Sequence, residues 1–173
     1  MNNKFTLKEP VFTETHIGSN SNPITGFITG DELKELISQC MENYDEKNIH
    51  ACSYDLRNLR LRRASTSHIH ELKHGKDYKL YSGISTLVFS EETINIPLDV
   101  IVVLKLRNYS ILEGLSLSAP IYVPGHNTRL CARVRNDGPT YFEISYGEPI
   151  LQAFFIKLSK KAPAYDGKYQ NNI

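Results

Sequence analysis

The densest set of chemically reactive side chains in the sequence is a basic stretch that contains three histidines. Its basic side chains and histidines are Arg60, Arg62, Arg63, His68, His70, Lys73, His74 and Lys76. On a β-strand, His68 and His70 would face the same side and could bind one metal ion. The arginines could instead contact the phosphates of a nucleic acid.

Neither interpretation of this stretch has a second pattern behind it. No further metal ligand lies at a diagnostic spacing from the histidines within HIHELKH. Aromatic residues that would stack on bases are not interleaved with the arginines. We therefore predict an exposed hairpin with solvated charges, with neither a metal site nor a strong nucleic-acid site.

Composition limits the other classes of function. The chain has 173 residues, enough for one domain with a proper core, and its hydrophobic fraction of 40% is that of a globular protein. A net charge of +1 creates no overall field that would recruit nucleic acid or a membrane, and no window has the roughly 18 apolar residues of a membrane span. The N-terminus lacks a secretory signal, and Cys40, Cys52 and Cys131 form an odd, unpatterned set. We expect reduced thiols in a cytoplasmic protein.

The elements that must position any site are mostly short β-strands. Between residues 94 and 138, apolar β-rich runs cover residues 101–106, 115–122 and 130–134. Turn residues interrupt them at Pro97, Glu113-Gly114, Pro124-Gly125 and the Asn-Asp-Gly run at 136–138. Strands at this spacing predict an all-β sandwich or barrel, and a site is expected where the turns converge.

The rest of the chain adds one helix and further strands. Leu33, Leu36, Ile37 and Cys40 recur at helical spacing, which predicts a helix from residue 30 to about 43, with Thr29 and Glu32 as a capping box. We expect a strand that begins at residue 49 and runs into a loop at 53–57, and a pair of strands within 78–90. Residues 94–97 alternate between apolar and polar side chains and are expected to form an edge strand. A strand at 141–145 is expected to pair through the 136–139 turn, and residues 150–158 are expected to form a buried strand. Residues 1–22 are predicted to be an N-terminal arm, 23–159 the β domain, and 160–173 a polar C-terminal tail with no core to join.

Five segments in this order resemble the dCTP deaminase branch of the dCTP deaminase/dUTPase superfamily. They are GFITGDEL at 26–33, SYDLR at 53–57, IPLDV at 96–100, the Pro-Gly turn at 124–125 followed by Asn-Asp-Gly at 136–138, and YDGKYQ at 165–170. The resemblance covers nearly the whole chain. It implies a distorted β jelly roll with short helices, assembled as a homotrimer with nucleotide sites between subunits. It also implies triphosphates bound with Mg²⁺, no catalytic zinc, and a tail that closes over the nucleotide.

The resemblance also implies a set of nucleotide-binding residues. The positions that match or neighbour the family's binding motifs are Asp55, Arg107, Ser110, His126, Tyr165, Lys168 and Gln170. The family's phosphate segment R-S-S-L-A-R-x-G-L aligns with residues 107–115, where Asn108 and Tyr109 replace the two serines and Leu112 replaces the second arginine. A leucine cannot donate the forked hydrogen bonds with which an arginine holds a phosphate.

The catalytic positions of the family are also changed. Its D-P-G-W-x-G segment, followed by a glutamate, places Val123 at the aspartate and Arg133 at the glutamate. In the family's deaminases that glutamate activates water, and a guanidinium cannot accept and return a proton near neutral pH. Glu113, Asp137 and Glu143 are the nearest carboxylates in sequence, and no catalytic residue is assigned.

Three functions follow from these observations. We favour a dCTP deaminase-like protein that binds a deoxynucleotide or a similar anion with weak or no turnover. The first alternative is an active dCTP deaminase or dUTP hydrolase with rearranged catalytic groups. The second is a non-catalytic trimeric scaffold whose residues 1–22 and 58–76 bind a protein partner.

Overall fold

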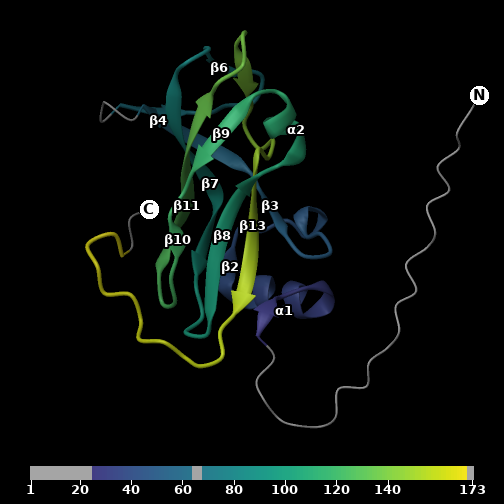
Figure 1. The fold of residues 1–173 in the computed structure, drawn as a ribbon, viewed down its shortest axis with the longest axis vertical. Coiled ribbons are helices and arrows are strands. Elements are labelled where there is room, and N and C mark those ends of the chain that lie inside the picture. The colour runs from purple at the N-terminus through teal and green to yellow at the C-terminus, as the bar shows by residue number, and fades with distance from the viewer. Residues whose placement is uncertain (1–24, 64–67, 171–173) are drawn as a thin grey trace, which may run out of the picture.

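Two antiparallel β-sheets that share one hydrophobic core make up most of the fold (Figure 1). The structure is a computed structural model and describes residues 25–63 and 68–170. The core draws alternate residues from both sheets, among them Val88 of one and Val102 and Phe155 of the other. The predicted all-β fold is therefore confirmed. The predicted N-terminal arm lies outside the described residues.

The first sheet has the strand order β1-β13-β8-β10, with β3 also paired to β13. Its strands are β1 (Gly26–Phe27), β3 (Tyr54–Leu56), β8 (Val100–Leu106), β10 (Ile121–Tyr122) and β13 (Leu151–Lys157). The apolar run predicted to be a buried strand is β13, whose Leu151, Ala153 and Phe155 are buried.

The second sheet has the order β5-β4-β7-β11-β9, with β2 also paired to β7. Its strands are β2 (Met41–Glu42), β4 (Asn58–Arg63), β5 (Ile69–Glu71), β7 (Ser85–Asn95), β9 (Leu115–Ser118) and β11 (Asn127–Asn136). The basic stretch thus forms the predicted hairpin, β4 and β5, at the edge of this sheet. A small third sheet pairs β6 (Tyr78–Leu80) with β12 (Phe142–Ile144).

Short helices connect the strands. Helix α1 (Gly30–Cys40) confirms the predicted helix and buries Leu33, Ile37 and Cys40 against the core. Thr29 is its N-cap residue, but its side chain makes no capping hydrogen bond, so the predicted capping box is wrong. The 3₁₀ helix η1 (Glu46–Asn48) and the helix α2 (Asn108–Leu112) did not appear in the sequence-based prediction.

Several predicted strand pairings are wrong, because these strands pair with partners that are distant in sequence and not with their neighbours along the chain. The segment 53–57 is not a loop, since β3 pairs with β13. Strand β6 pairs with β12 and not with β7, and β12 does not pair with β11 through the 136–139 turn. Residues 94–95 are not an edge but the end of β7, which lies between β4 and β11. The run 115–122 breaks near Pro120 into β9 and β10, which belong to different sheets.

The tail takes a definite path along the domain (Figure 1). It leaves the end of β13 and passes to the side of β10 and β11, with the Ala162 amide donating to the Leu98 carbonyl at 2.8 Å. In the part of the chain that the structure describes, no helix is long and apolar enough to span a membrane.

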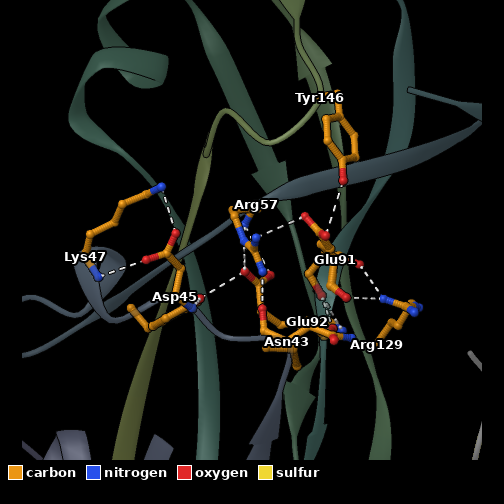
Figure 2. Close-up of polar contacts among 11 residues, drawn as sticks. Asn43, Asp45, Lys47, Arg57, Glu91, Glu92, Arg129 and Tyr146 are labelled. Carbon is orange, nitrogen blue, oxygen red and sulfur yellow. Dashed lines mark hydrogen bonds and ion pairs between the residues drawn. The ribbon is translucent and has the colours of Figure 1, made fainter. Parts of the chain in front are cut away.

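A buried ion pair joins the end of β3 to β7 (Figure 2). The Glu92 side chain is 1% exposed, and its Oε1 accepts from Arg57 Nε at 2.9 Å and from the Tyr54 hydroxyl at 3.0 Å. Burial raises the pKa of Glu92 above the usual glutamate range in spite of these donors. Arg57 also donates to the Asn43 carbonyl and lies 3.4 Å from a carboxylate oxygen of Glu91.

Neighbouring contacts extend this polar cluster across the second sheet (Figure 2). Arg129 of β11 donates to the backbone carbonyls of Ser90 and Glu91 on β7. The Tyr146 hydroxyl donates to the Glu91 carboxylate at 3.2 Å. The cluster therefore ties β3, β7 and β11 together through side chains as well as through the backbone.

Removal of Arg57 tests this cluster. In Arg57→Met, Glu92 stays buried without its charged partner, and we expect a loss of about 3–5 kcal/mol in the free energy of unfolding, measured by urea denaturation. The double variant Arg57→Met/Glu92→Leu should recover much of this loss because no unpaired charge remains. A double variant that is less stable than Arg57→Met would contradict the assignment.

Candidate functional site

The predicted nucleotide-binding residues lie in two separate cavities. The first is a hollow of about 290 Å³ beside α2, which we term the Asp55 pocket. Its lining residues are His50, Ser53, Asp55, Arg107, Asn108, Tyr109 and Gln152. Strand pairing assembles it, because β13 places Gln152 opposite Asp55 of β3 and also opposite Lys105 of β8, two residues before Arg107.

Asp55 is the centre of this pocket. Its side chain is 6% exposed, and its Oδ2 accepts from Arg107 Nε at 3.0 Å and from His50 Nε2 at 2.9 Å. An ionised carboxylate can only accept, so the His50 ring donates from Nε2, and in its neutral form the ring would have Nδ1 available as a proton acceptor. Such an oriented imidazole is able to act as a general base. The sequence did not lead us to predict His50 as a site residue, because its position five residues before Asp55 is the only hint that it offers.

Ser110 does not reach the Asp55 pocket. It lies in α2 and is completely buried, and its hydroxyl donates to the Ile150 carbonyl at 3.4 Å. Leu112 occupies the position of the family's second arginine and is 84% exposed. Arg107 therefore brings the only guanidinium of this segment to the pocket.

The second cavity has a volume of about 590 Å³ and lies under the C-terminal tail. We term it the tail cavity. Its walls come from the tail and from both sheets, and its lining residues are Arg60, Arg62, Ile69, Leu87, Phe89, Pro120, Ile121, Tyr122, Val123, His126, Thr128, Arg129, Cys131, Tyr165 and Tyr169.

The tail is held over this cavity by hydrogen bonds to the Pro-Gly turn. The Tyr165 amide donates to the Pro124 carbonyl at 2.9 Å. The side-chain amide of Gln170 donates to the Gly125 carbonyl at 2.9 Å and accepts from the Asn127 amide at 3.1 Å. Gln170 thus closes the tail onto the start of β11, although it does not itself line the cavity.

Gly125 is required for this close approach. Its φ is +73°, and a Cβ at this position would lie 2.6 Å from the Ala164 Cβ and 2.7 Å from the Ala164 Cα. Those distances are far below ordinary contact, so a side chain here would push the tail away. The glycine of the Pro-Gly turn therefore permits the docking of a segment about 40 residues later in the chain.

Aromatic rings form one wall of the tail cavity. The ring of His126 lies 4.3 Å from that of Tyr165 and 5.7 Å from that of Tyr122, measured between centroids. His126 Nε2 donates to the Tyr169 carbonyl at 3.0 Å, which assigns the proton to Nε2 because a carbonyl only accepts. Lys168 is exposed, with its Nζ 4.9 Å from the centroid of the Tyr169 ring.

No carboxylate lines the tail cavity among the residues that the structure describes. Val123, at the family's aspartate position, is part of the wall, whereas Arg133 is exposed on β11 outside the lining. The nearest carboxylates in sequence, those of Glu113, Asp137 and Glu143, do not line the tail cavity. Glu113 is exposed, Asp137 pairs with Arg135 at 2.8 Å, and Glu143 lies 3.9 Å from Lys79.

The histidines of the basic stretch are engaged elsewhere. His70 packs on Tyr78, with ring centroids 5.2 Å apart, and His74 on Tyr146 at 4.5 Å. Within residues 25–63 and 68–170, no group of three His, Cys, Asp or Glu side chains could hold a metal ion.

The sequence is similar to two curated dCTP deaminases. The chain is 29% identical over 133 residues to the dCTP deaminase of Thermococcus kodakarensis and 30% identical over 136 residues to that of Pyrococcus horikoshii. Each match covers 76% of this chain and 85% of the relative. No protein-family model matches the chain.

Solved structures show the same fold. The 2'-deoxycytidine 5'-triphosphate deaminase of Agrobacterium tumefaciens matches with a TM-score of 0.66 at 14% identity, over 77% of this chain and 48% of that one, so that this chain spans about half its length. A mutant dUTPase of phage phi11 of S. aureus, whose structure describes a structural Mg(II) ion, matches with a TM-score of 0.51 at 9% identity over 73% of this chain and 90% of that chain.

Substitution of Gly125 tests the docking of the tail. In Gly125→Ala the new methyl group collides with Ala164, and we expect the amides of residues 162–170 to lose protection in hydrogen–deuterium exchange. Gly83→Ala is the matched control, because Gly83 also has a positive φ, +77°, but has open space around its Cβ position. It should cost about 1–2 kcal/mol of backbone strain and leave the tail protected. Equal protection of the tail in both variants would show that Gly125 does not control docking.

Proposed function

The chain belongs to the dCTP deaminase/dUTPase superfamily, and we propose that it binds a pyrimidine deoxynucleotide in the tail cavity with weak or no turnover. The observation that carries this proposal is the lining of that cavity, which combines aromatic rings and guanidinium groups and, among the residues that the structure describes, contains no carboxylate. Rings and cations suit a base and its phosphates. Deamination and hydrolysis both need a group that takes a proton from water, and within one subunit none of the described residues that line the cavity is a carboxylate.

The tail serves as the cover of this site. Residues 160–173 close over the nucleotide, with Tyr165 and His126 beside the base and Lys168 reaching the phosphates. The support for this role is that Tyr165 and Gln170 already dock on the Pro-Gly turn. In this proposal residues 23–159 form the domain on which the tail closes, and residues 1–22 are a separate N-terminal arm.

The Asp55 pocket belongs to the same site in a homotrimer. Within one chain, Asp55 and Arg107 line a different cavity from His126 and Tyr165. In our proposal, the Asp55 pocket of one subunit faces the tail cavity of the next, so that Arg107 contributes to one nucleotide site between them. Neighbouring proteins with the names dCTP deaminase and dUTPase support a nucleotide as the ligand.

Mg²⁺ would enter this site with its triphosphate. Proteins usually hold Mg²⁺ through one or two carboxylates together with the phosphates of the substrate. Because the tail cavity supplies no carboxylate among the described residues, phosphate oxygens and water would provide the ligands. The three cysteines are free thiols, which suits a reducing compartment, and we propose the cytoplasm with its nucleotide pool.

One observation supports an active enzyme as the second candidate. His50 is half-exposed in the Asp55 pocket and oriented by Asp55, and it could take the place of the family's missing base. This candidate requires that His50 of one subunit face the nucleotide in the neighbouring tail cavity.

Nucleotide binding is tested by thermal shift with dCTP, dUTP, dTTP and CTP plus Mg²⁺, with chromatography of the same samples. A ligand at about 100 times its Kd should raise the Tm by roughly 5–10 °C. We expect a shift with at least one deoxynucleotide and no product. Lys168→Ala should abolish the shift, whereas Lys160→Ala, an exposed lysine earlier in the tail, should preserve it.

The other outcomes separate the candidates. Appearance of dUTP or dUMP would favour the active enzyme, and His50→Gln should then remove the product while the thermal shift persists. If none of the four nucleotides changes the Tm, our proposal is overturned and a scaffold that binds a protein is favoured.

A further inference from the structure

Three arginines form the wall of the tail cavity on the outer face of the second sheet. Arg60 and Arg62 come from β4 and Arg129 from β11, and all three line the cavity. Strand register places Arg60 opposite Phe89 of β7. The guanidinium carbons of Arg60 and Arg62 lie 5.3 Å and 5.9 Å from the centroid of the Phe89 ring. We term these three residues the arginine trio.

No carboxylate of the described residues lines the cavity beside the trio. In the described part of the chain, none of the three arginines forms an ion pair within 4.0 Å. Arg60 Nε is buried and donates to no acceptor among the described residues. A buried donor without an acceptor costs free energy, and an anionic ligand in the cavity would supply the acceptor.

The contacts of Arg129 fix the geometry of the trio. Its Nη1 donates to the backbone carbonyls of Ser90 and Glu91, which hold the guanidinium at the wall. Burial, and after it the nearby charge of Arg60, lowers the pKa of Arg129, while the charges of Glu91, Glu92 and Glu71 oppose this shift. Glu71 pairs with Arg60 in the β4–β5 register, but it is exposed and lies outside the lining. The wall of the cavity thus holds three cations close together, and no carboxylate of the described residues shares that wall.

We propose that the arginine trio binds the phosphate chain of the nucleotide whose base lies against the aromatic wall of the same cavity. The identity of the base rests on the proposed function, whereas the phosphate site stands on the trio itself. Three guanidinium groups suit a polyphosphate, since each can donate two parallel hydrogen bonds to its oxygens. The cavity volume of about 590 Å³ lies in the range of small-molecule sites.

The trio also accounts for a loss elsewhere in the chain. The family's second phosphate-binding arginine is Leu112 here, and Ser110 is buried against Ile150. None of Arg60, Arg62 and Arg129 lies within the five segments that first indicated the family. The trio therefore adds cationic donors for the phosphate chain from the outer face of the second sheet.

The test uses the full-length protein with inorganic tripolyphosphate, dCTP and deoxycytidine, each titrated by calorimetry at fixed ionic strength. Arg60→Gln and Arg62→Gln should each weaken tripolyphosphate binding about tenfold or more, because each removes a charge-assisted contact. Arg63→Gln is the matched control, since Arg63 follows Arg62 on β4 and is exposed but does not line the cavity. The affinity of Arg63→Gln for tripolyphosphate should differ from that of the wild type by less than about twofold, because an exposed charge outside the site contributes little.

The outcomes distinguish this inference from the proposed function. If tripolyphosphate does not bind, or binds Arg60→Gln and Arg62→Gln as tightly as the wild type, the phosphate site is wrong even when dCTP binds. If tripolyphosphate binds and depends on the trio but dCTP and deoxycytidine show no affinity beyond it, the phosphate site stands and the nucleotide proposal fails. Arg60→Lys keeps the positive charge, so this variant should retain more affinity for tripolyphosphate than Arg60→Gln. Equal losses of affinity in the two variants would overturn the phosphate assignment.

Discussion

The buried ion pair between Arg57 and Glu92 is the constraint on which both cavities depend. Glu92 is 1% exposed, so a misplaced Arg57 would leave a carboxylate without compensation inside the domain. Arg57 follows β3 directly, and Asp55 lies on that strand, while Phe89 precedes Glu92 on β7. The pair therefore positions the Asp55 pocket and the outer face of the second sheet at once. Within the SYDLR segment, Arg57 therefore pairs with a buried carboxylate, whereas Asp55 lines a pocket.

The two cavities differ in their electrostatics. In the Asp55 pocket, the carboxylate is shared between Arg107 and His50, so that the charges are largely matched inside the protein. In the tail cavity, Arg60, Arg62 and Arg129 form no ion pair among the described residues, and no carboxylate of those residues lines the cavity. A matched cluster orients its members, whereas an unmatched one attracts an anion. This difference makes the tail cavity the better candidate for the phosphates of a ligand.

The residues at the positions that match the family's catalytic motif differ from it in charge and polarity. Val123 contributes an apolar surface to the tail cavity where a carboxylate would activate water, and Arg133 adds positive charge to the outer face of β11. His126 stacks on Tyr165 and secures the tail through the Tyr169 carbonyl. These differences are the basis of the proposal that the cavity binds a ligand with weak or no turnover.

Apolar periodicity and ordered motifs are local signals, and from them the sequence predicts the β-rich fold, helix α1, the buried strand β13 and the family. The resemblance also predicts that Arg133 stands at the position of the family's glutamate. Tertiary structure alone decided that β6 pairs with β12 and that Gly125 receives the tail. It also placed Asp55 and His126 in different cavities, and it brought Arg60 and Arg129, from the strands on either side of β7, into the same cavity. These contacts connect residues dozens of positions apart, and their energies depend on packing and burial that no local pattern encodes.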